Sequence, residues 1–239
     1  MNETKIIPIE KLEFRLAEWQ WPFANDHRAE ITSHFNALKR KKPALWNGRV
    51  FLLRDFDVSD AVLRGVFFEA DFADLLAWRD WGFQDQSIHA CFAMAAIEGV
   101  DKGFVLGTMG QHTANADLIY FPTGTPDPDD LDGERVDLDR SVRRELAEET
   151  GLEFDQFQTE PGWHAVFSGQ HIAMIKRLRA LESAENIRGR VLAFLARQKQ
   201  PELSDIHLLY GSADLTPAVP LYVRAYLEHV WRDNNTRTL

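Results

Sequence analysis

The sequence predicts an α/β fold in which helices cover a mixed β-sheet, and three observations support this. Segments rich in β-branched and aromatic residues alternate with segments of helical periodicity, without the strict βαβ repeat of a wholly parallel sheet. The chain has 239 residues, enough for one large domain or for a domain with a substantial extension. Its composition, 45% hydrophobic and 27% charged, is that of an ordinary globular protein and excludes a disordered or fibrous chain.

Charge and cysteine content exclude several classes of function. The formal net charge of −10 argues against a large nucleic-acid interface, which needs a basic face. The single cysteine, Cys91, excludes an internal disulfide and a thiolate zinc cluster, and its apolar surroundings predict a buried thiol. No apolar stretch approaches the ~20 residues needed to span a bilayer, and the first residues do not resemble a signal peptide. We therefore expect a cytoplasmic protein that binds neither nucleic acid nor membranes.

The first third of the chain predicts an N-terminal α/β extension over residues 1–84. Turn and capping residues separate its apolar segments. The expected elements are an edge strand over 4–16 that tolerates Pro8, a helix from a cap at Asn25 and Asp26 to about Lys41, a hairpin of 49–56 and 61–69 joined by DVSD, and a short helix opened by Asp71 and closed by Gly82.

The remaining residues predict a second unit over 85–235. It alternates strand-like and helical segments around one loop rich in Pro, Gly and Asp. The expected elements are strands over 88–97, 103–109 and 117–121, a loop over 124–137, a helix over 138–150 ended by Gly151, strand material within 163–175, a helix over 184–199, a strand over 206–210 and a helix over 217–232.

The helix predicted over 138–150 carries a stripe of carboxylates. Glu145, Glu148 and Glu149 stand at positions i, i+3 and i+4, so they share one face beside an apolar edge. Such like charges repel one another, and a bound hard cation removes that penalty, since Mg²⁺ and Ca²⁺ take oxygen ligands. Arg144 precedes Glu148 by four residues and can hold one carboxylate in place. A solvated acidic helix face is the alternative interpretation of the glutamates alone.

Residues 144–152, RELAEETGL, resemble the second half of the signature of the Nudix hydrolases: Arg-Glu, an aliphatic residue, any residue, Glu-Glu, any residue, Gly and an aliphatic residue. The first half departs from that pattern, because Asp130 and Val136 stand where the signature has a glycine and a glutamate. Gly124, in FPTGTP, follows a strand as the family's glycine does. It lies twenty residues before the arginine, which implies an insertion of about six residues in the loop.

The resemblance implies an α/β/α sandwich on a mixed sheet and a metal-dependent hydrolase. By resemblance, Glu145, Glu148 and Glu149 bind Mg²⁺ or Mn²⁺, the carbonyl of Gly124 is an extra ligand, and Arg144 orients the carboxylates. The implied reaction is hydrolysis of the pyrophosphate bond in a nucleoside diphosphate linked to another moiety, such as a nucleotide sugar, ADP-ribose or coenzyme A. LWNG at residues 45–48 resembles, more weakly, a Trp-Asn-Gly segment of the branch that acts on UDP-sugars. This resemblance serves only to rank the substrates, and a nucleoside diphosphate linked to another moiety ranks first.

Several roles stay open at the level of sequence. Which acidic residue of the insertion at 125–137, if any, replaces the missing glutamate is open. Glu134 and Asp137 are the leading candidates, and the insertion also holds Asp127, Asp129, Asp130 and Asp132. The base that accepts the proton of the attacking water is Glu149 or a carboxylate on a later loop, such as Glu160. Many relatives are dimers, so a homodimer is one expected assembly. A non-catalytic Nudix-like domain that binds a nucleotide or a protein partner is the alternative function.

Tryptophans and arginines supply candidate substrate contacts. Trp46, Trp78, Trp81 and Trp163 are candidates to stack on a base, although isolated tryptophans are more often core residues. Trp163, just after the signature helix, has the best claim among them. Arg135 is a candidate contact for phosphate.

Overall fold

Two β-sheets organise the part of the chain that the computed structural model describes, the backbone of residues 4–236 and the side chains of 4–233. The larger sheet runs in the order β1 (Lys5–Ile9), β12 (Trp163–Ser168), β13 (His171–Arg179), β5 (Ala90–Glu98), β6 (Phe104–Met109) and β14 (Leu203–Leu209). The short strands β7 (Ile119–Tyr120), β8 (Thr123–Gly124) and β11 (Gln158–Thr159) pair with β6, β5 and β13. The smaller sheet runs in the order β3 (Arg49–Ser59), β4 (Val62–Asp71), β2 (Lys11–Leu16), β10 (Arg135–Val136) and β9 (Leu131–Asp132).

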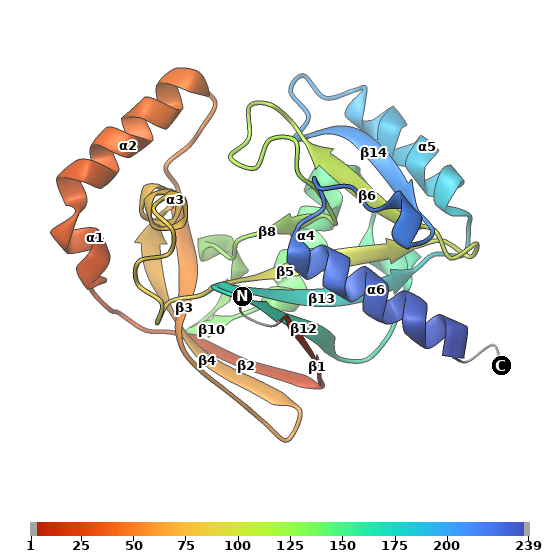
Figure 1. The fold of residues 1–239 in the computed structure, drawn as a ribbon, viewed down its shortest axis with the longest axis horizontal. Coiled ribbons are helices and arrows are strands. Elements are labelled where there is room, and N and C mark those ends of the chain that lie inside the picture. Colours follow the sequence, from red (N-terminus) through yellow and green to blue (C-terminus); the bar gives the residue numbers. More distant parts are fainter. Residues whose placement is uncertain (1–3, 237–239) are drawn as a thin grey trace.

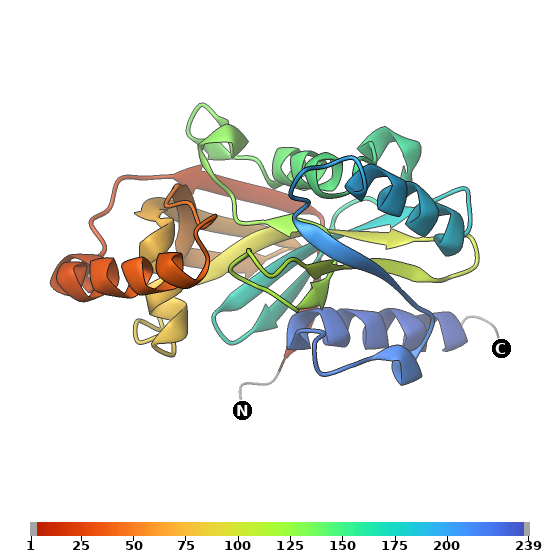
Figure 2. The same ribbon diagram turned by 90° about the horizontal axis from the view of Figure 1, so that it is seen from above.

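Helices cover both faces of the larger sheet (Figure 2). The helices α4 (Leu138–Thr150) and α5 (Ala184–Leu195) lie on one face, and α6 (Leu221–Thr236) lies on the other (Figures 1 and 2). The central strand β5 is buried along its whole length, which explains its continuous apolar sequence. Its pairing with β13 is parallel and its pairing with β6 is antiparallel, so the sheet is mixed. The predicted α/β class is confirmed.

A second group of helices packs with the smaller sheet: α1 (Pro22–Asp26), α2 (Arg28–Lys41) and α3 (Phe72–Asp80) (Figure 1). As expected, Asp71 is the N-cap of α3, and it forms a capping box with Asp74. Trp78 is fully buried and meets Trp21 edge to face, with ring centroids 5.8 Å apart. Aromatic contacts therefore hold this N-terminal group together, and their residues belong to the same hydrophobic core as the larger sheet.

The segment predicted as one strand over residues 4–16 forms two strands in different sheets. β1 pairs with β12 of the larger sheet, whereas β2 pairs in parallel with β4 of the smaller one. The chain bends at Glu10, whose N–H donates to the carbonyl of Ala61 at 2.7 Å. Part of the expected extension 1–84 is thus an edge strand of the larger sheet, and a division between two units at residue 84 stays a prediction.

Three other local predictions differ from the structure. The helix expected from Asn25 is interrupted at His27, which is the N-cap of α2. The turn of the β3–β4 hairpin falls at Asp60 and Ala61, where φ is +52° and +58°, a geometry that suits the twist of the strands. The loop expected over 124–137 contains short strands, since its backbone groups find partners on the edge of β2. No described helix has both the length and the hydropathy that would span a bilayer.

Candidate active site on helix α4

Helix α4 begins and ends where the sequence predicts. The carboxylate of Asp137 accepts hydrogen bonds from the N–H groups of Asp139 and Arg140, and Gly151 ends the helix with a left-handed φ of +68°. Val142 and Leu146 are fully buried and fix the apolar edge of the helix. This edge packs toward β5 and sets the direction of the glutamates beside it.

Glu145 lies against the backbone of the short strand β8, which follows β7. A Cβ atom added at Gly124 would be 1.9 Å from Oε1 of Glu145, so only glycine permits this approach. The side chain of Glu145 is nearly buried. Burial raises the pKa of Glu145 to about 7, with Arg144 opposing the shift and Glu148 adding to it. The predicted proximity of Gly124 to the carboxylates is thus present.

Glu149 is the most deeply buried of the three carboxylates, with 2% of its surface exposed. Its Oε2 accepts a hydrogen bond of 3.2 Å from the N–H of Thr123. Burial raises the pKa of Glu149 well above its usual range, and the charges of Glu202 and Glu145 raise it further. Tyr120 is also buried, and burial together with the charge of Glu149 raises the pKa of its hydroxyl. Glu149 therefore lies in an acidic environment that favours cation binding.

Arg144 connects the helix to the acidic loop. One guanidinium nitrogen, Nη1, contacts Glu145 at 2.8 Å and Glu148 at 3.3 Å. The other, Nη2, contacts Asp130 at 3.0 Å and Asp127 at 3.3 Å. Burial lowers the pKa of Arg144, but these acidic partners outweigh that effect and hold its pKa above the usual range. Arg144 is accordingly a fixed cation that orients two of the three glutamates.

The structure brings to helix α4 two acidic residues of the insertion that are not the leading candidates from the sequence. Asp127 and Asp130 reach Arg144, and the side chain of Asp130 is fully buried. Of the two leading candidates, Asp137 caps α4 and pairs with Arg135 at 2.6 Å, whereas Glu134 is exposed. The β9–β10 hairpin separates Asp127 and Asp130 from Asp137 along the chain. The composition of the loop did not predict this hairpin.

Glu202, which precedes β14, is not among the residues predicted from the sequence. Much of its side chain is open to solvent, but desolvation of its carboxyl and the charge of Glu148 raise its pKa, while His112 lowers it. The charge of Glu202 in turn raises the pKa of both Glu145 and Glu149. A lone glutamate before a strand carries no local signal. Its place comes from the antiparallel pairing of β14 with β6.

Three other candidates have their contacts elsewhere. The ring of Trp163 is 5% exposed and lies beneath the Lys176 ammonium, whose nitrogen is 4.4 Å from the ring centroid. Arg135 pairs with Asp132 and Asp137. Glu160 pairs with Arg179 at 2.5 Å. The structure does not place these three residues among the α4 carboxylates.

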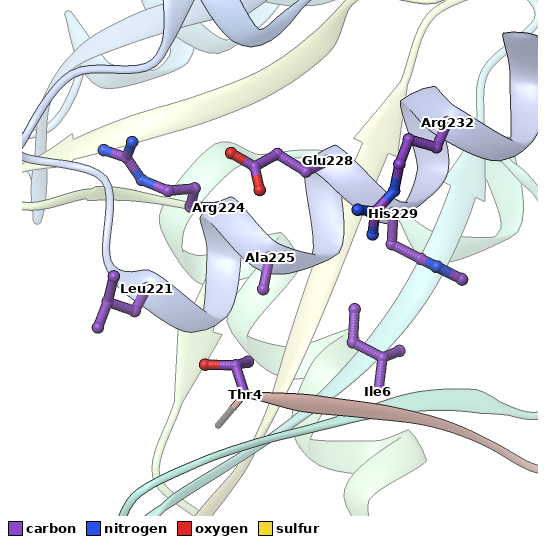
Figure 3. A pocket seen from close by; sticks show the side chains of 8 residues that line it. All are labelled: Thr4, Ile6, Leu221, Arg224, Ala225, Glu228, His229 and Arg232. Carbon is purple, nitrogen blue, oxygen red and sulfur yellow. The ribbon is translucent and has the colours of Figure 1, made fainter. Parts of the chain in front are cut away.

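A half-open cavity of about 500 Å³ lies between β1 and α6 (Figure 3). Its lining residues come from these two elements and the start of the described chain, and none belongs to α4. Since α6 covers the opposite face of the larger sheet from α4, this cavity is separate from the carboxylates (Figure 2).

The donor chemistry of the α4 site fits a hard divalent cation. Its acidic side chains offer carboxylate oxygens, which Mg²⁺ and Mn²⁺ prefer as ligands, and a cation would relieve the repulsion among these carboxylates. Within the described residues, no three His, Cys, Asp or Glu side chains already form a group that could hold a metal ion. Arg144 contacts Glu145 and Glu148 at once, and Glu148 extends toward solvent, so a shared cation requires side-chain rotation at Glu148.

No protein-family model and no curated protein matches this chain. Among solved structures, a Nudix hydrolase from M. smegmatis, RenU, is 13% identical, covers 62% of this chain and 86% of its own, and has a TM-score of 0.39. An Ap4A hydrolase from C. elegans is 16% identical, with coverage of 62% and 97% and a TM-score of 0.39. A NUDIX hydrolase from Nitrosomonas europaea is 14% identical, with coverage of 62% and 89% and a TM-score of 0.37. These identities and TM-scores are low, so the chemistry of the α4 site rests on the residues of this chain.

Proposed function

We propose that this protein is a divalent-metal-dependent hydrolase of the Nudix type that cleaves the pyrophosphate bond of a nucleoside diphosphate derivative. The observation that carries the proposal is the set of three glutamates in RELAEETGL on α4, with Glu145 against Gly124 and Glu149 against Thr123. If the glutamates only formed a solvated acidic face, no glycine would be needed where Glu145 meets Gly124. Such a face would also leave its carboxylates in water, whereas Glu145 and Glu149 are buried.

The proposed ligands of Mg²⁺ or Mn²⁺ are Glu145, Glu148 and Glu149, with the carbonyl of Gly124 as an extra one. When bound, the cation neutralises the diphosphate, activates a water and stabilises the leaving phosphoryl oxygen. Arg144 orients Glu145 and Glu148, and it is itself fixed by the buried Asp130. This fixed geometry reduces the reorganisation that the reaction requires.

The reaction needs a base for the attacking water. The water oxygen forms a bond to phosphorus, the anhydride P–O bond breaks, and the leaving phosphate takes its electron pair. A carboxylate accepts the proton of the water. Glu149, expected from the sequence, and Glu202, found in the structure, are the candidates for this role. Glu202 suits it because no salt bridge binds its carboxylate among the described contacts, and its raised pKa favours proton acceptance.

The proposed substrate is a nucleoside diphosphate linked to another moiety, of the nucleotide-sugar, ADP-ribose or coenzyme A type. The acidic site repels a free anion unless a cation neutralises part of the charge. A diphosphate that binds as its metal complex therefore fits this site better than a free diphosphate.

The test is incubation of the protein with UDP-sugars, ADP-ribose and coenzyme A, with and without Mg²⁺, and detection of the released mononucleotide. The proposal predicts turnover of at least one substrate that a chelator abolishes and that the double variant Glu148→Gln, Glu149→Gln lacks. Turnover that survives in the double variant would contradict it. Metal-dependent thermal stabilisation by nucleotides without any turnover would support the alternative, a Nudix-like binding domain.

A further inference from the structure

The backbone of residues 120–126 lies against both buried carboxylates of helix α4. The N–H of Thr123 donates to Oε2 of Glu149 at 3.2 Å. One residue later, the backbone at Gly124 is the surface on which the Glu145 carboxylate packs. A displacement of this segment would therefore move the groups that hold both glutamates, so the geometry of the site depends on how the segment itself is held.

The central strand of the larger sheet holds the middle of the segment. The N–H of Ala95 in β5 donates to the carbonyl of Pro122 at 3.0 Å, and the hydroxyl of Thr123 donates to the carbonyl of Ala93 at 2.6 Å. The strand β8 that pairs with β5 here is only two residues long. The backbone and polar groups on either side of β8 therefore have to find partners elsewhere.

The N-terminal part of the chain supplies partners at both ends of the segment. At one end, the N–H of Phe51 in β3 donates to the carbonyl of Pro126 at 2.7 Å. At the other end, the amide of Asn115 donates to the hydroxyl of the buried Tyr120 at 3.1 Å, and Arg79 of α3 donates to the side-chain oxygen of Asn115 at 2.9 Å. The β6–β7 loop, which carries Asn115, extends toward the N-terminal helices in both ribbon views (Figures 1 and 2).

The chemistry of these side chains fixes the direction of each hydrogen bond. A guanidinium group only donates, so the amide of Asn115 turns its oxygen to Arg79 and its NH₂ group to Tyr120. The Nε of Arg79 donates to Asp80 at 2.8 Å, which holds the guanidinium in place. Burial, together with the charge of Glu149, raises the pKa of the Tyr120 hydroxyl, so this group stays protonated and accepts from Asn115.

We propose that Asn115 is a positioning residue of the α4 metal site. It holds Tyr120 and thereby the segment 120–126, whose backbone places the two buried glutamates. This inference rests on the proposed function and makes a contact from α3, outside the signature helix and its loop, part of what determines cation affinity. Mg²⁺ demands near-ideal ligand geometry, so loosening this anchor should weaken cation binding even where the fold is kept.

Mn²⁺ binding without substrate, measured by calorimetry, tests this assignment. Asn115→Ala should weaken Mn²⁺ binding about five- to tenfold, as expected for the loss of one hydrogen bond, and should raise the Mn²⁺ concentration for half-maximal turnover by the same factor. The kcat at saturating Mn²⁺ should stay within about threefold. Asn36→Ala, the same change at an exposed asparagine of α2, is the matched control and should alter neither quantity.

A second variant tests the path through the tyrosine. Tyr120→Phe keeps the ring and its packing but removes the hydroxyl that Asn115 holds, so it should weaken Mn²⁺ binding as Asn115→Ala does. Because both changes break the same contact, the double variant should bind Mn²⁺ about as well as either single one. Fully additive losses would contradict the path.

Unfolding midpoints measured in parallel separate positioning from a purely structural role. A lower midpoint for Asn115→Ala with unchanged Mn²⁺ affinity would overturn the inference. Mn²⁺ binding that Glu149→Gln abolishes but Asn115→Ala leaves intact would refute the inference alone and leave the proposed function standing. Asn115-dependent Mn²⁺ binding without turnover of any substrate would refute only the hydrolase. Absence of Mn²⁺ binding to the unmodified protein would overturn both.

Discussion

Replacement of Gly124 by alanine tests whether activity depends on the position of the Glu145 carboxylate. The added Cβ would lie 1.9 Å from Oε1 of Glu145, and ordinary van der Waals contact begins at 3.4 Å, so the carboxylate has to move by about 1.5 Å. Misplacement of a catalytic group by about 1 Å can cost about a hundredfold in rate, so we expect kcat/KM to fall by about that factor. The side chain of Glu145 is flexible and can rotate away, so the cost in folding free energy should stay within about 1–3 kcal/mol.

The assay is steady-state release of mononucleotide in Mg²⁺, with the unfolding midpoint of each variant measured in parallel. Gly189→Ala is the matched control, since a Cβ there meets no heavy atom within 4 Å, and it should keep full activity. If displacement of Glu145 is the cause, Gly124→Ala should add little to the loss caused by Glu145→Ala. Activity of Gly124→Ala within about threefold of the unmodified protein would refute the role given to this carboxylate.

Two further predictions concern stability. The folded protein holds the proton of Glu145 up to a pKa of about 7, against 4.5 ordinarily, so without divalent cations the free energy of unfolding should fall as pH rises between these values. Glu145→Gln should remove up to about 3 kcal/mol of that fall in denaturant titrations, and an unchanged slope would contradict the raised pKa. Arg177 and Glu98 form a buried two-bond ion pair at 2.8 and 2.9 Å, so Arg177→Met should cost about 3–5 kcal/mol in thermal unfolding. Replacing both Arg177 and Glu98 by methionine should recover most of that loss. If Arg177→Met alone were as stable as the unmodified protein, the stabilising role of the ion pair would be contradicted.

Local signals made helix α4 predictable. Asp137 and Gly151 mark its ends, and the spacing of Glu145, Glu148 and Glu149 fixes their common face before any tertiary contact is known. Long apolar segments such as β5 were also predictable, because every residue of the strand is buried and the sequence is therefore continuously apolar.

The partners of that helix were not predictable, because tertiary pairing places them. Asp130 reaches Arg144 through a hairpin of two-residue strands, which are too short to leave a pattern. Glu202 comes to the site by pairing of β14 with β6, about a hundred residues away along the chain. Trp46 lies on the surface because its neighbours Leu45 and Asn47 hold the loop, and no local propensity predicts that exposure.

The most direct test of the central claim compares the turnover number of the unmodified protein with that of Glu149→Gln, with Glu153→Gln as the control. Glu149 is buried with a raised pKa, so a neutral glutamine fits its place and the variant should fold, while Glu153 is exposed just beyond the helix. If the α4 carboxylates catalyse pyrophosphate hydrolysis, turnover requires Mg²⁺ or Mn²⁺, Glu149→Gln lowers kcat by at least about a hundredfold, and Glu153→Gln leaves it unchanged. Equal kcat values for all three proteins would contradict the claim.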